Sequence, residues 1–310
     1  MATPPLYTTL DAHLKQIFGQ KVQKIPLDAG SDCPNRDGTL GRGGCVFCNA
    51  AGSGSGLSGS LSLAEQWRYW RKKFSESDRL KNTKLFLAYI QSFTNTYGPA
   101  RRLRDMIGEL VDLPGIAGLS IGTRPDCVDE EKLAILAAAP WQETWIEFGV
   151  QSMNDATLLR INRGHDSVCS RRAITMAHDA GIKVCVHLMA GLPGETPTDF
   201  IETVRSVCRL PIEGIKLHGL YVCRGSLLEK DWAAGLYSPM APETYIDTIA
   251  EAITLIPTHI ILHRLTADPG KGELLAPEWA SRKGDIVHGI EEALRLTGRR
   301  QGSALPARRA

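Results

Sequence analysis

Apolar and polar positions along this chain follow two periods in turn, which predicts alternating strands and helices. Residues 84–91, KLFLAYIQ, form a nearly unbroken apolar run, as expected for a strand that is buried on both faces. Residues 62–74, SLAEQWRYWRKKF, instead place apolar side chains three and four residues apart. That spacing indicates an amphipathic helix, with Ser62 as its N-cap.

The same strand–helix unit recurs along most of the chain. Predicted strands occupy 21–30, 84–91, 116–123, 144–152, 182–192, 214–223 and 259–265. Predicted helices occupy 62–74, 98–112, 129–139, 154–180 with a break near Gly164, 197–210 and 241–256. Six or seven such units without an obvious reversal favour an α/β fold in which a parallel sheet, covered by helices, closes into a whole or partial barrel.

Unusual polar residues cluster directly after the predicted strands. In parallel barrels the chemistry is located at the carboxyl ends of the strands and in the loops that follow them. The residues found at these positions are Cys33, Gln91–Ser92, Thr123–Arg124, Gln151–Ser152, Gly191–Glu195 and Cys223–Arg224. The sequence therefore predicts a functional site at this end of the sheet.

Composition and charge narrow the class of protein. Of the 310 residues, 43% are hydrophobic and 23% charged, which are ordinary globular values. The net charge of +2 demands neither a nucleic acid nor a membrane as partner. Arginine-rich spots at 68–73, 101–104 and 299–300 permit a polyanion partner, although such runs are typical of solvated helix faces.

The chain shows no signal peptide and no apolar stretch near the ~20 residues that span a bilayer. We therefore expect a cytoplasmic protein without membrane contact. In that reducing compartment the eight cysteines indicate metal binding or catalysis rather than disulfides.

Three cysteines occur within one glycine-rich segment, CPNRDGTLGRGGCVFCN, as Cys33, Cys45 and Cys48. Their thiolates suit zinc or an iron–sulfur cluster. A structural zinc site needs four protein ligands, and no second Cys/His pair lies at ribbon or finger spacing. A 4Fe–4S cluster held by three thiolates leaves one iron open for another ligand. Incidental buried cysteines are a third interpretation, which a C-x-x-C pair with a third cysteine in the same loop disfavours.

Several motifs resemble a known family, the YhcC-like radical S-adenosylmethionine (SAM) proteins, which are related to the catalytic-subunit branch of elongator. They are the cysteine segment, GTRPDCV, RINRGHD, HLMAGLPGET, GIKLH, LLAPEW and QGSAL. The resemblance implies a partial (β/α)6 TIM-type barrel that carries a 4Fe–4S cluster. SAM would chelate the open iron, and its reductive cleavage would give a 5′-deoxyadenosyl radical. An electron donor such as flavodoxin or ferredoxin would supply the electron.

The resemblance also implies a division of the chain. Residues 1–30 would form an N-terminal segment with the first strand, 31–240 the core barrel, and 241–310 a helix and strand extension packed on it. The first cysteine gap is longer than in the common superfamily pattern C-x3-C-x2-C. The Gly/Ser-rich tract 50–60 is expected to be a mobile lid.

The resemblance places cofactor contacts, while the catalytic residues stay unknown. Phe47 would meet the adenine of SAM or pack in the core, and Gln91 with Ser92 would replace a Gly-Gly-Glu stretch that holds the amino group of SAM. Thr123 and Arg124 end the third strand, where related enzymes use a polar residue for SAM; neighbouring Asp126 is a second candidate there or a helix cap.

The remaining implied contacts follow later strands. Gln151 would bind the ribose, and Arg163 would pair with the carboxylate of SAM through a forked, charge-assisted contact. His187 matches a polar cofactor-contacting position, and Gly191 allows close approach of the backbone to the adenine. His218 and His263 are candidates for substrate contact, with structural roles as the alternative.

Three functions are consistent with these patterns. The favoured one is a SAM-cleaving radical enzyme whose substrate the sequence does not identify; the relationship to elongator suggests tRNA, modified at the C5 substituent of the wobble uridine. A radical SAM enzyme that acts on a small-molecule metabolite is the second, and a non-catalytic iron–sulfur or zinc protein is the third. The oligomeric state stays open.

Overall fold

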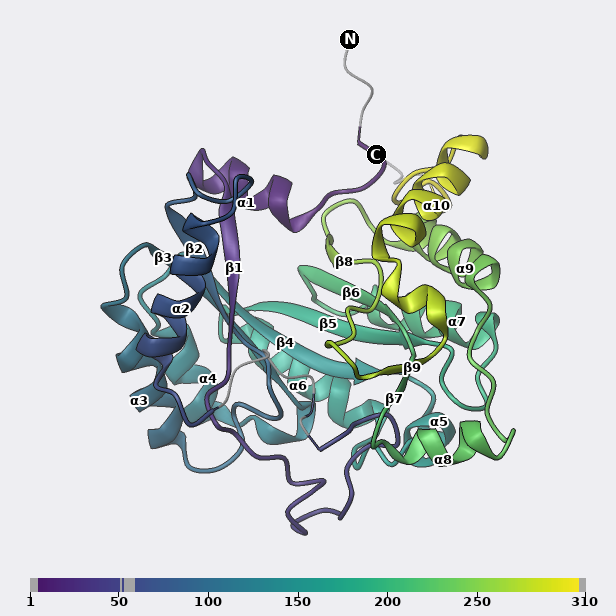
Figure 1. The fold of residues 1–310 in the computed structure, drawn as a ribbon, viewed down its shortest axis with the longest axis horizontal. Helices are drawn as coiled ribbons and strands as arrows, with labels where there is room; N and C mark the ends of the chain where they lie inside the picture. The colour runs from purple at the N-terminus through teal and green to yellow at the C-terminus, as the bar shows by residue number, and fades with distance from the viewer. Residues whose placement is uncertain (1–4, 51, 53–58, 307–310) are drawn as a thin grey trace.

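Seven parallel strands form one curved sheet in a computed structural model that describes residues 5–50, 52 and 59–306 (Figure 1). The strands follow chain order across the sheet. They are β1 (Val22–Leu27), β2 (Leu85–Ile90), β3 (Ile116–Thr123), β4 (Glu143–Gln151), β5 (Lys183–Ala190), β6 (Gly214–Gly219) and β8 (Ile261–Arg264). The expected α/β partial barrel is confirmed. Most of the Gly/Ser-rich tract, with its expected lid, lies outside the described residues.

Helices cover the outer, convex face of the sheet and connect its strands (Figure 1). They are α2 (Leu63–Ser75), α3 (Ala100–Val111), α4 (Glu130–Ala137), α6 (Ser167–Asp179), α7 (Pro197–Val207) and α9 (Pro242–Leu255). The short helix α5 (Asp155–Arg160) lies instead at the carboxyl end of the sheet, beside the cysteine loop (Figure 1). Ser62 caps α2 as predicted, in a capping box with Glu65. The predicted break near Gly164 separates α5 from α6, because Asn162 and Gly164 both have positive φ.

The predicted strand 214–223 is wrong in its second half. Strand β6 ends at Gly219, and the chain then forms β7 (Val222–Cys223), which pairs antiparallel with β9 (Leu274–Ala276) in a separate ribbon. Trp279 packs so closely on Gly219 that a Cβ there would lie 2.7 Å from its ring. The chain leaves the sheet at this contact with Trp279, which is distant in sequence and so is not visible in the local pattern.

The chain also forms helices that the sequence analysis did not predict. They are α1 (Leu10–Phe18), α8 (Leu227–Ala233) and α10 (Lys283–Leu296), with short 3-10 turns η1 (Pro125–Cys127) and η2 (Glu278–Ser281). Helix α1 contacts β1 and β8, and Thr9 bridges to Leu262. In Figure 1 it lies at the amino end of the sheet, opposite the cysteine loop.

The layer between the sheet and its covering helices is apolar, whereas part of the barrel interior is polar. Most core residues lie between the strands and the covering helices. Strands β4 and β6 nevertheless carry buried Glu147 and Lys216. The domain limits at residues 30 and 240 stay a prediction. None of the helices in the described part of the chain is both long and apolar enough to cross a bilayer.

Candidate functional site

A cavity of about 590 Å³ lies within the barrel and continues to the cysteine loop. All three cysteines of the loop line it. Seven predicted cofactor contacts line it too: Phe47, Gln91, Thr123, Arg124, Gln151, Arg163 and His187. Ser92 and Gly191 are not among the described residues that form its wall. The structure therefore gathers most of the predicted site into one place.

The cysteine loop is held by contacts with the turn between α5 and α6. Asn35 Nδ2 donates to the carbonyl of Asn162, and Asn162 Nδ2 donates in return to the carbonyl of Gly44 at 2.7 Å. Cys48 N donates to Cys45 O at 2.9 Å, which closes a tight turn between these two cysteines. Cys45 is buried, while Cys33 and Cys48 are half-buried. These bonds fix the loop against the carboxyl end of β4.

Arg163 is the main positive charge beside Cys45. Its side chain is buried, and it donates to the carbonyl of Gly149 and, through Nη1, to Cys45 Sγ at 3.4 Å. A hydrogen bond from Cys48 and the charge of Arg163 hold the pKa of Cys45 well below its usual range, although burial opposes this. The loop therefore favours a thiolate, which is the form that binds metals.

Gly149 makes room for the side chains around it. A Cβ at this position would lie 2.7 Å from Arg163 Nη2 and 2.8 Å from Gln151 Nε2. Gln151 itself has a φ of 71°, a backbone conformation that is costly for a residue with a side chain. Strained backbone of this kind is concentrated at functional sites.

Arg124 brings a second guanidinium to the same end of the cavity. It forms a two-pronged ion pair with Asp126, with Nε–Oδ1 at 2.9 Å and Nη2–Oδ2 at 2.8 Å. Asp126 therefore binds Arg124, and Asp129 caps α4 instead. The Nη1 atom of Arg124 is buried without a partner among the described residues. A buried donor of this kind calls for an acceptor, such as an anionic ligand.

The sequence profile of the radical SAM superfamily matches residues 41–207, and that of its C-terminal domain matches residues 212–295. The chain belongs to the radical SAM superfamily. Within this superfamily it is 39% identical to Protein YhcC of Escherichia coli (strain K12) over 307 residues, which are 98% of this chain and 97% of that protein. It therefore belongs to the YhcC family, as the motifs suggested.

A second radical SAM relative matches only part of the chain. The tRNA uridine(34) acetyltransferase of Dehalococcoides mccartyi is 32% identical over 154 residues, 49% of this chain and 33% of that protein. Among solved structures, the archaeal Elp3 of Methanocaldococcus infernus superposes with a TM-score of 0.69 at 17% identity. This match covers 90% of the present chain and 64% of that chain, and it shows a shared fold.

Radical SAM enzymes use a 4Fe–4S cluster and SAM, and the residues of this chain fit both groups. Three thiols face one cavity, and their loop already favours a thiolate at Cys45. The unpartnered Nη1 of Arg124 and the guanidinium of Arg163 suit anionic groups nearby. The protein is thus a radical SAM enzyme whose own residues provide a suitable cofactor site.

Deeper in the barrel, on the amino-end side of the cysteine loop, the interior holds an ionic cluster that the sequence analysis did not predict. Glu147 on β4 accepts hydrogen bonds from Lys24 at 3.1 Å, Ser120 at 2.5 Å and Lys216. Its Oε2 lies 2.7 Å from Nε2 of His187. Burial alone would raise the pKa of Glu147, but the two lysines lower it well below its usual range. The available signal was a charged residue inside each of three apolar strands.

Proposed function

We propose that this enzyme cleaves SAM reductively, with Cys33, Cys45 and Cys48 as the ligands of its 4Fe–4S cluster. The observation that carries this proposal is that these three thiols line the same cavity as Arg163 and Arg124. When bound, the cluster and SAM would supply a 5′-deoxyadenosyl radical that abstracts hydrogen from the substrate. The chain would orient these groups and exclude side reactions.

Each lining residue has a role that follows from its chemistry. Arg163 offsets negative charge at Cys45 and presents a fork suited to the carboxylate of SAM. Arg124, fixed by Asp126, offers its remaining donor to the same anionic region. Gln151 supplies an amide for the ribose. Thr123 would offer its hydroxyl from the cavity wall, where a hydrogen bond of 2.6 Å with Thr96 holds it in place.

The other proposed contacts with SAM rest on less direct support. Phe47 would contact the adenine, while Gln91 and His187 would contact polar groups from the cavity wall. Ser92 Oγ is buried without a partner in the described part of the chain, which leaves it able to bond to a ligand or water. Gly191 has a φ of 85° and a carbonyl that accepts from Tyr237 at 2.9 Å. Its backbone would approach the adenine.

Anaerobic reconstitution tests the cofactor proposal. Wild-type protein with iron, sulfide, SAM and dithionite should form 5′-deoxyadenosine, measured by liquid chromatography. Cys45→Ala should bind less iron and form none. Cys208→Ala is the matched control, because this half-buried cysteine packs against the core outside the cavity wall. Tetrahedral zinc in oxygen-free wild-type protein would contradict the proposal.

We further propose that the substrate is tRNA, modified at the C5 substituent of the wobble uridine. The partial relationship to a tRNA uridine(34) acetyltransferase supports this choice. Helices α2 and α3 pack against each other and expose basic side chains suited to a phosphate backbone. These side chains are Arg68, Lys72, Lys73, Arg101 and Arg104.

Nucleoside profiling tests the tRNA proposal. Total tRNA from a deletion strain should lack or accumulate one modified uridine relative to wild type, and a plasmid copy should restore the profile. An unchanged profile would contradict tRNA as substrate and favour a small-molecule metabolite.

The electron donor and the compartment are also proposals. One-electron reduction of the cluster calls for a donor such as flavodoxin or ferredoxin. The eight cysteines are all unpaired thiols, which supports a reducing compartment such as the cytoplasm.

A further inference from the structure

The interior of the barrel, around Glu147, contains more cationic than anionic side chains. Lys24 from β1 and Lys216 from β6 lie 4.6 and 4.2 Å from the ring centre of Tyr89. Both bind Glu147, whose side chain is fully buried. Because two ammonium groups share one carboxylate, this layer carries excess positive charge when both lysines are protonated. Buried charge is costly unless it is paired, so an anion would stabilise it.

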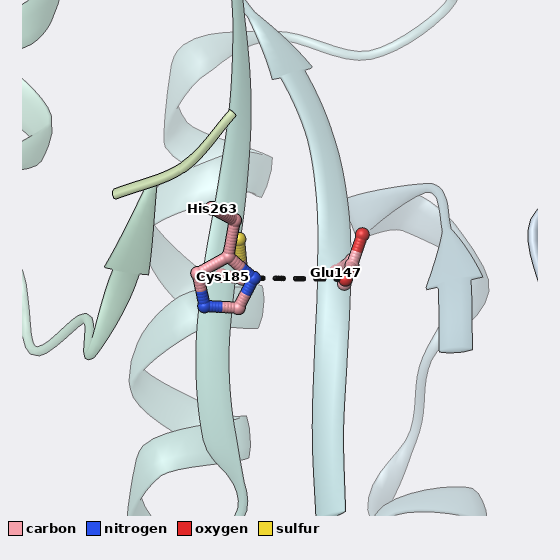
Figure 2. Close-up of side chains that lie close together, drawn as sticks. All are labelled: Glu147, Cys185 and His263. Atoms are coloured by element: carbon pink, nitrogen blue, oxygen red, sulfur yellow. Dashed lines mark ion pairs between the residues drawn. The ribbon is translucent and has the colours of Figure 1, made fainter. Parts of the chain in front are cut away.

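A metal ion is the obvious alternative occupant of this layer. Glu147, Cys185 and His263 offer ligand atoms within 4.8 Å of one another, and Figure 2 shows these side chains, from β4, β5 and β8, lying close together. Both ring nitrogens of His263 are buried without a hydrogen-bond partner among the described residues. However, the only carboxylate of this trio already binds two lysines. A divalent cation would add charge where positive charge is already in excess, so electrostatics disfavours a metal here.

The cationic side chains of the barrel interior differ in whether they reach the cavity. Lys216 has a side chain only 3% exposed and is not among the described residues of the cavity wall. Lys24 and Arg264 do line the wall, with side chains 23% and 29% exposed. Among the described residues Arg264 forms an ion pair only with Asp268, at 4.0 Å, and the side chain of Asp268 is largely exposed. Arg264 therefore retains charge that can be offered to a ligand, and Lys24, although paired with Glu147 at 3.1 Å, still has further N–H donors for one.

His218 supplies a neutral donor beside these cations. Its Nε2 atom is buried without a partner in the described part of the chain, and the residue lines the cavity. Burial, His187 and Arg264 together lower the pKa of His218 well below its usual range. A neutral imidazole with a proton on Nε2 donates one hydrogen bond, which complements two flanking cations around an oxyanion.

We propose that the inner end of the cavity is an anion subsite, where Lys24, Arg264 and His218 bind a carboxylate or phosphate group of the substrate. This inference rests on the proposed function, because it takes the cavity to be the substrate cavity. To that function the inference adds the chemical class of the substrate group that lies deepest in the cavity. An anionic group held there orients the substrate with its reactive carbon toward the cysteine loop.

Anion titration tests the subsite without requiring turnover. Cluster-loaded wild-type protein, saturated with SAM but without reductant, is titrated by calorimetry with inorganic phosphate and separately with acetate, at constant ionic strength. At least one anion should bind saturably with one site per chain. Arg264→Gln and Lys24→Met should each weaken that binding at least tenfold. The anion that binds more tightly identifies the substrate group as phosphate or carboxylate.

Controls separate this subsite from general charge effects and from the proposed function. Lys81→Met removes an exposed cation that pairs with nearby Asp78, outside the cavity wall, and it should leave anion binding unchanged. Arg264 is partly exposed and ends the edge strand β8, so Arg264→Gln tests the subsite even if Lys24→Met fails to fold. Saturable binding that survives Arg264→Gln, or no saturable binding in wild type, overturns the subsite. So does stoichiometric zinc binding that Cys185→Ala abolishes. Absence of 5′-deoxyadenosine overturns only the proposed SAM cleavage.

Discussion

Arg163 Nη1 lies 3.4 Å from Cys45 Sγ, and the same guanidinium donates to the carbonyl of Gly149. One side chain thereby joins the cysteine loop to the carboxyl end of β4. A lysine at this position has a single ammonium and cannot form the same fork. The contact therefore depends on arginine and not merely on positive charge.

We expect Arg163→Lys to weaken retention of the cluster. Hydrogen bonds to charged groups contribute about 1.5–3 kcal/mol each, so loss of one should accelerate iron release to a chelator roughly tenfold or more. Iron release is followed by absorbance under anaerobic conditions. Arg160→Lys, at an exposed position of α5, is the matched control and should release iron at the wild-type rate. Equal rates for wild type and Arg163→Lys would contradict this role.

Gly149→Ala should disturb two cofactor contacts at once. The new methyl group would meet Arg163 Nη2 and Gln151 Nε2 at less than van der Waals distance. Overpacking of this kind costs about 1–3 kcal/mol of unfolding free energy, and SAM affinity should fall as well. Denaturant unfolding and SAM titration measure the two effects.

Gly108→Ala is the control for that substitution. Gly108 lies within α3, and outside the backbone of that helix nothing lies within 4 Å of an added Cβ. The substitution should therefore stabilise the protein by about 0.5–1 kcal/mol. If Gly149→Ala behaved like Gly108→Ala, the close packing around Gly149 would be disproved.

Glu147→Gln should destabilise the fold strongly. Removal of one partner from a buried ion pair costs about 3–5 kcal/mol, because Lys24 and Lys216 would remain buried without a counter-charge. Urea unfolding at pH 7 provides the measurement. Glu202→Gln, which breaks a mainly exposed pair with Arg205, should cost less than about 1 kcal/mol. A small effect at Glu147 would indicate that the lysines are neutral in the folded protein.

His263 should make the protein less stable in acid. Burial, together with the charge of Lys24, lowers its pKa well below 6.5, although Glu147 opposes this; Lys216 and His187 also face it and lower the pKa further. The unfolded chain thus takes up a proton near pH 6.5 that the folded protein excludes. The stability contributed by neutral His263 is present above pH 6.5 and is lost as pH falls below it.

His263→Leu should therefore flatten the fall in unfolding free energy below pH 6.5, by up to about 1.4 kcal/mol per pH unit. Urea unfolding between pH 5 and pH 8 provides the test, with about pH 8 as the reference where only packing differs. An unchanged slope would show that this imidazole gains its proton in the folded state as easily as in the unfolded chain.

Local sequence was sufficient to predict most strands, the break near Gly164 and the cysteine loop. Their signals are short-range: apolar runs, capping residues, and thiols within one segment. The ends of strands β2 to β5 also identified polar residues that reach the cavity, such as Gln91 and Gln151. These features follow from periodicity, because carboxyl ends of parallel strands share one edge.

The sequence by itself determined the repeated strand–helix order and the three thiols, which together with its motifs identified the family. Only the tertiary structure decided that Lys24, Glu147 and Lys216 meet inside the barrel, since they belong to strands more than sixty residues apart. It likewise decided that β6 ends at Gly219, under Trp279. Charge pairing and steric contact across the barrel depend on curvature and register, which no local pattern encodes.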